Sequence, residues 1–384
     1  MRIGIDGLFA CNNWGGLSTY ARQIITHLVQ VDTENEYILF VEKESQSPVA
    51  ASEHVQIQWL DKRPKRQTFY DERLVWDQEI LGDAVATAGI DLFFGPVFMT
   101  PLTRPCPAVI TVHDLIFITH PQVYPVSTLG YYGVWGRLCA ESAEGMITMS
   151  HDTKRLLGSR YGLDEAKVTV TYGAVEESFR PAENNDAVTA LQQKYNFKPN
   201  YVIYVGGTFP ERKNYPTLIR AYAQLPKTLR QIHPLVFLTG SKQSYGKRRM
   251  QEVFEEEQLG SDVTEDIVVL DFVERDELVT FYQGADVMVY PSIYEGFGLP
   301  PLEAMSCGTP VITTTAPAMN EVVADGGLLV DPLDVAGMAG ALERVLRDAD
   351  FKQQLGKVGL ARSRQFSWQE TARGTLAAFE KIVR

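Results

Sequence analysis

Short apolar runs alternate along the chain with longer segments in which apolar residues recur at helical spacing. Runs of this kind, bounded by glycine, proline or acidic residues, predict buried strands. In the first half of the chain they cover residues 3–5, 37–41, 55–59, 91–95, 108–112 and 145–149, and in the second half residues 201–205, 235–238, 267–270, 287–290, 311–313 and 328–330. Because strands and helical patterns alternate, we expect an α/β protein with doubly wound parallel sheets.

The length of the chain indicates that this pattern forms two domains. Its 384 residues exceed the size at which a single hydrophobic core usually stops growing. A polar, turn-rich stretch at residues 179–186 is typical of a linker. We therefore expect an N-terminal α/β domain at residues 1–180 and a C-terminal α/β domain at residues 181–366.

Composition excludes several classes of protein. The chain is 45% hydrophobic and 22% charged, close to the average of soluble globular proteins, and its net charge of -12 argues against nucleic acid as a partner. We expect no transmembrane helix, because no stretch of roughly 18 apolar residues occurs, and no export signal at the N-terminus. The four cysteines are scattered without metal-like spacing, as in reduced cytoplasmic proteins.

One basic stretch leaves two interpretations open. Lys62, Arg63, Lys65 and Arg66 precede an aromatic and apolar segment that ends at Trp76. Such a mixture is typical of a surface that contacts anionic lipid, here at the inner face of the cell membrane. It is also typical of a solvated loop before a core helix.

The segment at residues 292–312 carries the strongest chemical signal. Glu295 precedes Gly296 and Gly298, whose lack of side chains lets backbone amides approach a ligand closely. Two prolines follow and can occupy the first turn of a helix, whose free amides then face the ligand. Seven residues separate Glu295 from Glu303. A purely structural turn would not need two carboxylates around two glycines.

Further candidates lie at the ends of predicted strands. Gly15 and Gly16 follow the first strand and precede a helix, so their amides can bind an anion. His113 directly follows a later strand, at the edge where open α/β sheets bind ligands. Arg212 and Lys213 follow a glycine loop and can neutralise a diphosphate. Taken singly, each also has an ordinary structural interpretation, as a turn, a hydrogen-bonded histidine or a solvated helix end.

Together these motifs resemble the large family of retaining glycosyltransferases called family four. The matching residues are Glu-Gly-Phe-Gly-Leu-Pro from Glu295, Glu-Ala-Met-x-Cys-Gly-x-Pro-Val from Glu303, Gly-Gly-x-x-x-Tyr at residues 15–20 and Arg-Lys-Asn at residues 212–214. The resemblance implies the GT-B fold, in which two facing Rossmann-like domains enclose a deep interdomain cleft. It implies that the N-terminal domain, residues 1–180, lies on the acceptor side and that the C-terminal domain, residues 181–366, binds the nucleotide sugar. It also implies that a C-terminal helix at residues 367–384 crosses back to the N-terminal domain.

The resemblance also assigns roles to single residues. It implies four catalytic residues, which are His113, Arg212, Lys213 and Glu295. The resemblance also implies a set of donor-binding residues, in which Glu303 binds the ribose hydroxyls. The set consists of Gly15, Gly16, Gly207, Thr208, Gly240, Phe272, Val273, Gly296, Phe297, Gly298, Leu299 and Glu303.

The implied reaction is transfer of a hexose from a nucleotide-diphosphate sugar with retention of anomeric configuration. The acceptor would be a saccharide or lipid-linked saccharide in cell-surface polysaccharide biosynthesis. Family frequency places UDP-glucose or a similar UDP-hexose first as donor and GDP-mannose second. The leaving phosphate itself is thought to help deprotonate the acceptor, so neither glutamate needs to be a nucleophile.

We expect neither a metal nor a cofactor. The Asp-x-Asp at residues 348–350 lies in a helical, surface-like segment and not at a strand end, where a metal-nucleotide pair is expected. A nucleotide-sugar epimerase of the same fold and a non-catalytic nucleotide-sugar-binding protein remain alternatives. A glycoside hydrolase, which uses two carboxyl groups across the scissile bond, is disfavoured by the phosphate-binding loops.

Overall fold

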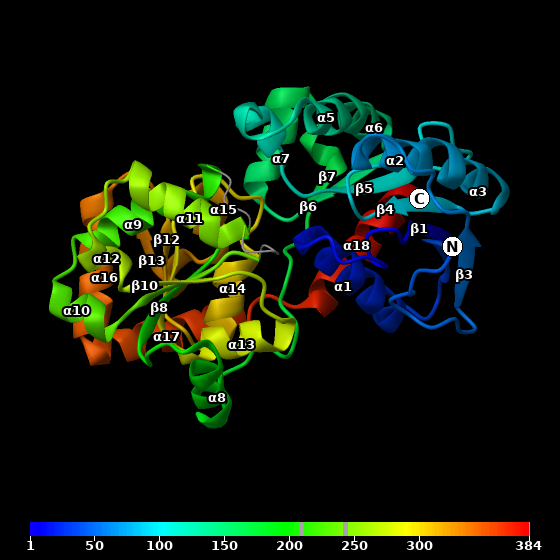
Figure 1. Cartoon of the computed structure of the whole chain (residues 1–384). Coiled ribbons are helices and arrows are strands. Elements are labelled where there is room, and N and C mark those ends of the chain that lie inside the picture. The colour runs from blue at the N-terminus through cyan, green and yellow to red at the C-terminus, as the bar shows by residue number, and fades with distance from the viewer. Residues whose placement is uncertain (208–210, 241–244, 384) are drawn as a thin grey trace. The chain divides into compact units, whose positions relative to one another are not determined.

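The structure is a computed structural model that describes residues 1–207, 211–240 and 245–383 (Figure 1). The chain forms two compact units. Unit 1 contains residues 1–174 together with residues 367–384, and unit 2 contains residues 175–366. The chain leaves unit 1 in a segment without helix or strand that precedes α8 (Asp186–Tyr195).

Unit 1 is built on a sheet of seven strands that are all parallel to their neighbours, in the order β3-β2-β1-β4-β5-β6-β7. The strands are β1 (Arg2–Asp6), β2 (Glu36–Glu42), β3 (Val55–Leu60), β4 (Leu92–Gly95), β5 (Ala108–Val112), β6 (Gly145–Thr148) and β7 (Val168–Val170). The order reverses between β1 and β4. In a doubly wound sheet, loops at the carboxyl ends of such a strand pair separate and leave room for a ligand.

Helices and helical turns connect these strands. The α-helices of unit 1 are α1 (Gly16–Val31), α2 (Phe69–Val75), α3 (Leu81–Thr87), α4 (Ile116–Thr119), α5 (Val126–Thr128), α6 (Arg137–Ser142), α7 (His151–Tyr161) and α18 (Trp368–Val383). Two π-helical segments, at Trp76–Ile80 and Leu129–Gly136, join α2 to α3 and α5 to α6, and 3-10 turns cover Pro121–Val123 and Glu165–Lys167.

The last helix packs within unit 1. Figure 1 shows α18, in red, beside α1, and it also contacts β6 and β7. Phe379 is fully buried, with its ring 5.1 Å from that of Phe94, and Trp368 lies 5.8 Å from Tyr20. The apolar face of α18 therefore completes the core of unit 1.

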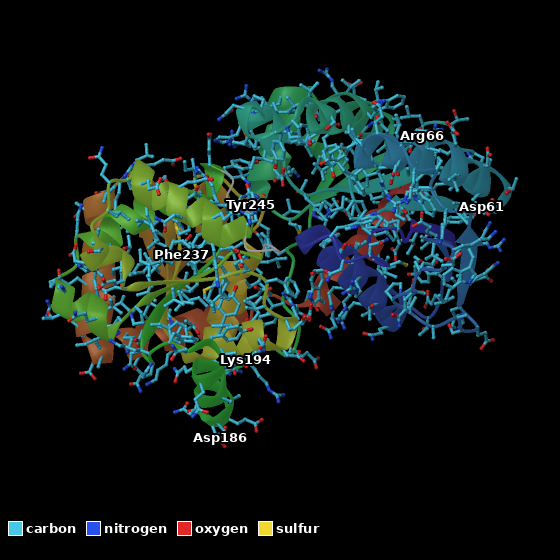
Figure 2. The ribbon with its side chains drawn as sticks, in the orientation of Figure 1. Asp61, Arg66, Asp186, Lys194, Phe237 and Tyr245 are labelled. Carbon is cyan, nitrogen blue, oxygen red and sulfur yellow. The ribbon has the colours of Figure 1, made fainter. Side chains whose placement is uncertain are left out.

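Unit 2 repeats this architecture with six parallel strands in the order β10-β9-β8-β11-β12-β13. Its strands are β8 (Tyr201–Val205), β9 (Leu235–Leu238), β10 (Ile267–Leu270), β11 (Ala285–Tyr290), β12 (Val311–Thr314) and β13 (Leu328–Val330). Its other α-helices are α9 (Tyr215–Ala223), α10 (Lys227–Ile232), α11 (Tyr245–Glu256), α12 (Ser261–Thr264), α13 (Arg275–Gly284), α14 (Leu299–Ser306), α15 (Pro317–Val322), α16 (Val335–Arg347) and α17 (Ala349–Ser363), with 3-10 turns at Glu211–Lys213 and Ala324–Gly326. Phe237 on β9 lies inside this unit (Figure 2).

The predicted α/β class with two Rossmann-like parallel-sheet domains is confirmed. Strands β5, β8, β9, β10 and β13 have the predicted limits. Strand β7 was not predicted, because a threonine interrupts its short apolar run. Helix α1 begins at Gly16, and the Ser18 Oγ accepts a hydrogen bond from the Trp14 amide at 2.9 Å.

The basic stretch at residues 62–66 is partly engaged in ion pairs. Arg63 Nε donates to Glu42 Oε1 at 3.0 Å, and the Arg63 guanidinium lies 5.0 Å from the centre of the Trp14 ring. Lys62 pairs with Glu44. These two cations therefore face neighbouring groups of the protein, and not only solvent or a membrane surface.

The aromatic part of the predicted membrane surface needs a correction. Trp76 is fully buried, because it belongs to the core beneath the sheet of unit 1. Lys65 and Arg66 are exposed. Among the described residues, none of the helices has the length and apolar character required to cross a bilayer.

A buried ion cluster joins α2 to the first strand. Arg73 Nη2 lies 2.6 Å from Asp6 Oδ2 and 2.9 Å from Asp77 Oδ1. Arg73 Nε donates to Tyr131 Oη at 3.1 Å, and that hydroxyl donates to Asp77 Oδ2 at 2.7 Å. Trp76 Nε1 donates to Asp6 Oδ1 at 3.1 Å. Burial raises the pKa of Asp77 to about 7, although the positive charge of Arg73 acts in the opposite direction.

Candidate active site

The carboxylate and cations predicted from sequence meet at one edge of the unit 2 sheet. Strand β8 leads to Arg212 and Lys213, and strand β11 leads to the loop that contains Glu295. The two strands are neighbours, and the strand order of the sheet reverses between them. Loops that follow such a pair flank the position where doubly wound sheets bind nucleotides.

Glu295 is the centre of this cluster. Its Oε1 accepts hydrogen bonds from Arg212 Nη1 and Lys213 Nζ, each at 2.8 Å, and from the Tyr290 hydroxyl at 2.9 Å. The Glu295 side chain is 11% exposed. Burial alone would raise its pKa, but the charges of Lys213 and Arg212 outweigh burial and lower the pKa to about 2. Glu295 is therefore ionised at neutral pH.

The backbone around this cluster is cross-linked. The Ile293 amide donates to the Arg212 carbonyl at 2.8 Å, which joins the loop after β11 to the turn after β8. Asn214, with φ of 51°, donates from Nδ2 to the carbonyls of Pro291 at 3.1 Å and Pro332 at 2.6 Å. The Arg-Lys-Asn element thus has two functions: the cations contact Glu295, and the asparagine holds the surrounding loops.

Glycines bring two loops close together at this edge. Gly207 and Gly240, at the ends of β8 and β9, have φ of +64° and +63°, and a Cβ on Gly240 would lie 3.5 Å from the Gly207 Cα. Left-handed φ values of this size favour glycine. Thr208, the neighbouring donor-binding candidate, lies outside the described residues.

Helix α14 begins at the other end of the Glu295 loop. Gly298 is its N-cap, with φ of 109°, and no side chain caps the helix. A Cβ on Gly298 would lie 2.3 Å from Met319 Cε. Phe297 is 3% exposed and packs against Phe366, so any contact of residue 297 with a donor must use its backbone. Gly296 and Leu299 flank the same turn.

Glu303, on the second turn of α14, lies in a separate buried cluster. Its Oε2 accepts from the Tyr282 hydroxyl at 3.0 Å, and its Oε1 lies 3.0 Å from Arg275 Nη1. Arg275 also pairs with Glu176 at 3.1 Å. Burial raises the pKa of Glu303, against the effect of the Arg275 charge. Each carboxylate oxygen has two lone pairs, so these contacts leave acceptor capacity for ribose hydroxyls.

Phe272 and Val273 lie in the loop between β10 and α13. The Phe272 side chain is 43% exposed. The Gly240 amide donates to the Asp271 carbonyl at 3.2 Å, which brings this loop beside the end of β9. The nucleotide-binding candidates of unit 2 are therefore contiguous along one sheet edge.

The remaining candidates belong to unit 1. His113 follows β5 and is 6% exposed. Its Nε2 lies 2.9 Å from the Pro96 carbonyl, which can only accept, so Nε2 carries the proton and Nδ1 is an acceptor. Burial lowers the pKa of His113 to about 4. Gly15, with φ of 76°, is the N-cap of α1, and Gly16 is the first residue of that helix.

Three partners of the site were missed by sequence reasoning. Tyr290, Tyr282 and Arg275 each contact one of the two glutamates. Tyr290 could have been suspected, because it is the last residue of a strand that ends at the site. Asp348, in the Asp-x-Asp sequence, caps α17 by accepting a hydrogen bond from the Phe351 amide at 2.9 Å.

Two Rossmann-like units of this topology are typical of the GT-B fold, and comparison with known proteins identifies the family. The family described as Glycosyltransferase Family 4 matches residues 14–179, and the one described as Glycosyl transferases group 1 matches residues 188–362. O-antigen chain mannosyltransferase B of Escherichia coli is 31% identical over 293 residues, which are 76% of this chain and 74% of that protein. The chain belongs to glycosyltransferase family 4.

Solved structures have the same fold. Sucrose-phosphate synthase from Thermosynechococcus elongatus superposes with a TM-score of 0.76 at 21% identity, over 99% of this chain and 98% of the other. HepE from Anabaena, solved in complex with UDP-glucose, superposes with a TM-score of 0.71 at 18% identity, over 98% of this chain and 99% of the other.

Proposed function

We propose that this glycosyltransferase transfers a mannose residue from a nucleoside diphosphate sugar to a saccharide or lipid-linked saccharide, with retention of anomeric configuration, in polysaccharide assembly. The observation that carries the proposal is the contact of Glu295 with Arg212 and Lys213 at the switch point of the unit 2 sheet. Two cations and one carboxylate leave a net positive charge where a diphosphate would bind.

The choice of donor sugar rests on the relative from Escherichia coli. Family frequency alone placed UDP-glucose before GDP-mannose. The name of the 31% identical relative, a mannosyltransferase, supports mannose as the transferred sugar, and we therefore propose GDP-mannose before a UDP-hexose. HepE, which was solved in complex with UDP-glucose, is only 18% identical to this chain, and the likeness supports the fold alone. A UDP-hexose is therefore the second candidate for the donor.

Charge stabilisation is the main chemical contribution that we propose. As the bond between sugar and diphosphate breaks, negative charge grows on the leaving phosphate, and Arg212 and Lys213 would stabilise it. Glu295, with its pKa near 2, has no proton to donate at neutral pH and would position the two cations and a sugar hydroxyl. The leaving phosphate would accept the acceptor proton on the same face of the sugar, which retains the configuration. We propose that this reaction requires neither a metal nor a cofactor.

Calorimetric titration tests this proposal. We expect the purified protein, in buffer with EDTA, to bind GDP more tightly than UDP or ADP, and then to bind GDP-mannose. Tight binding of UDP instead would indicate that the donor is a UDP-hexose. If none of the three binds, with or without added magnesium, the assignment of the unit 2 site is wrong. Product analysis without an acceptor separates a transferase from an epimerase, since only an epimerase changes the sugar of the intact donor.

A further inference from the structure

The two glutamates of unit 2 differ in the number of cations around them. Glu295 contacts both Arg212 and Lys213, whereas Arg275 is the only cation that forms an ion pair with Glu303 among the described residues. The Glu303 side chain is 6% exposed. An ionised carboxylate in such a position is costly unless a cation compensates it. The charge of Glu303 therefore depends on Arg275.

Four titratable groups face Glu303 from the elements packed around it. Arg275 and Tyr282 belong to α13, Glu176 lies before α8, and Cys307 is the C-cap of α14. Burial raises the pKa of Glu303, whereas the charge of Arg275 and the hydrogen bond from Tyr282 lower it. The negative charge of Glu176 raises the same pKa, and burial keeps the Cys307 thiol neutral. Arg275 is thus the group whose charge favours the ionised form of Glu303.

Arg275 occupies a helix position that is unfavourable for a cation. It is the first residue of α13, where unpaired backbone amides make the helix end positive, and acidic residues follow it at 276 and 277. Two carboxylates compensate for this position. Arg275 Nη1 lies 3.0 Å from Glu303 Oε1, and Arg275 Nη2 lies 3.1 Å from Glu176 Oε1. The planar guanidinium therefore bridges the two carboxylates with separate nitrogens, a geometry that the single ammonium of lysine does not reproduce.

The segment at residues 175–185, which follows unit 1 and has no helix or strand, holds the other side of this arginine. The guanidinium carbon of Arg275 lies 4.6 Å from the centre of the Phe179 ring, an attractive arrangement of a cation over an aromatic face. The Phe179 ring is buried and lies 6.0 Å from the ring of Tyr282. Both side chains that contact Glu303 therefore pack on this segment.

We propose that Arg275 is a positioning residue for donor binding, which keeps Glu303 ionised and oriented toward the ribose hydroxyls. Glu176 and Phe179 hold Arg275 in this position, so the segment between the two units contributes to donor binding through the arginine. An ionised carboxylate accepts hydrogen bonds from both ribose hydroxyls, whereas a protonated carboxyl group must use one oxygen as a donor. This inference rests on the proposed function, because it requires a nucleoside diphosphate in the unit 2 site.

A calorimetric comparison of GDP with 2′,3′-dideoxy-GDP tests the inference. The ratio of their dissociation constants isolates the contribution of the ribose hydroxyls, because the two nucleotides share the base and the diphosphate, and titration of the phosphate cancels. We expect wild-type protein to bind GDP about tenfold or more tightly than the dideoxy nucleotide at neutral pH. If UDP proves to be the tighter ligand, the corresponding uridine pair is used.

Arg275→Met should reduce this ratio about threefold or more at neutral pH, because loss of the cation raises the pKa of Glu303 and protonates it. The ratio should recover toward the wild-type value as the pH rises, since Glu303 then ionises without the arginine. A purely structural role of Arg275 would lower the ratio equally at every pH. A ratio equal to that of the wild type, or a reduced ratio that does not change with pH, would overturn the inference.

Two further variants in the same segment complete the test. Arg180→Met is the matched control, because Arg180 pairs with Glu183 and should leave the ratio unchanged at every pH. Glu176→Gln keeps an oxygen for Arg275 and removes the charge that raises the pKa of Glu303, so its ratio should be at least as large as that of the wild type. This expectation holds even if Arg275→Met does not fold. A lower ratio for Glu176→Gln would contradict the proposed charge balance.

The wild-type titrations separate this inference from the proposed function. If GDP or UDP binds and Arg275→Met keeps the wild-type ratio, the proposed transferase stands and the positioning role of Arg275 is wrong. If the wild type binds the dideoxy nucleotide as tightly as the parent nucleotide, Glu303 does not bind the ribose and the inference is again wrong. If no nucleotide binds, the assignment of the unit 2 site is wrong and both proposals fail.

Discussion

Glu295 keeps its negative charge although its side chain is almost buried, because Lys213 and Arg212 both contact the same oxygen. The same contact fixes the two cations, whose long side chains would otherwise have to be ordered when a diphosphate binds. The Glu295 carboxylate therefore holds the two positive charges of the site in place before a ligand binds.

Replacement of Lys213 by alanine is expected to lower kcat by about 10²–10³-fold, because the leaving diphosphate loses one stabilising charge. Glu295 retains Arg212 and Tyr290, so the protein should stay folded at assay temperature. The measurements are steady-state turnover and thermal unfolding. Arg220→Ala is the control, because Arg220 pairs with Glu257 on the outside of the same domain. Near-normal turnover of Lys213→Ala would remove its proposed role.

Asp77 provides a prediction about pH. Its pKa of about 7 in the folded protein exceeds the value near 3.9 expected in the unfolded chain. The folded state therefore binds the extra proton, and the free energy of unfolding should fall as pH rises from about 4 through about 7. Asp77→Asn cannot titrate at this position but can still accept from Tyr131. We expect denaturant unfolding to show a steeper decline with pH for wild type than for the variant. Parallel curves would show that Asp77 titrates normally.

At the scale of elements, the turn between β11 and α14 depends on one glycine. Gly298 combines a φ of 109° with a position where a Cβ would meet Met319. Gly298→Ala should destabilise the protein by about 1–3 kcal/mol in chemical denaturation, and it should weaken nucleotide-sugar turnover because the Glu295 loop shifts.

Gly340→Ala is the matched control for this prediction. Gly340 lies inside α16, where a Cβ would have no heavy atom within 4 Å. Alanine should stabilise this helix by about 0.5–1 kcal/mol. The proposed role of Gly298 fails if both alanine variants have the stability of the wild type.

Element positions were predictable where strands are buried on both faces. The central strands of both sheets are buried along most of their length, so their sequences are nearly continuous apolar runs that stand out from the helical segments. In strand β7 a threonine separates two valines, so it shows no apolar run. The two π-helical segments differ from α-helix by their hydrogen bonding and not by a pattern of residue types. These features could not be obtained from periodicity.

At the scale of the whole molecule, the net charge of -12 opposes binding to anionic membranes, so any contact must use a local basic surface. Lys65 and Arg66 are exposed members of the predicted surface, whereas Lys62 and Arg63 form ion pairs with Glu44 and Glu42. A peripheral contact through this surface remains a proposal.

Vesicle sedimentation tests the proposed membrane contact of residues 65 and 66. The double variant Lys65→Glu and Arg66→Glu should bind vesicles rich in anionic lipid about tenfold or more weakly than wild type, because each basic residue near such a surface contributes about 1 kcal/mol. The control is the double variant Lys247→Glu and Arg248→Glu, which makes the same charge change on α11 of unit 2. Equal binding by the two double variants would exclude a specific role for residues 65 and 66.

The sequence by itself determined the α/β class, most strand positions, the family and the identity of the charged residues, because buried strands and glycine loops leave local signals. Only the tertiary structure decided which groups meet. Arg212 and Glu295 are 83 positions apart and come together because β8 and β11 are neighbours in the sheet. Tyr290, Tyr282 and Arg275 became visible for the same reason. Contacts between distant segments depend on strand order and packing, and local residue patterns do not encode these directly.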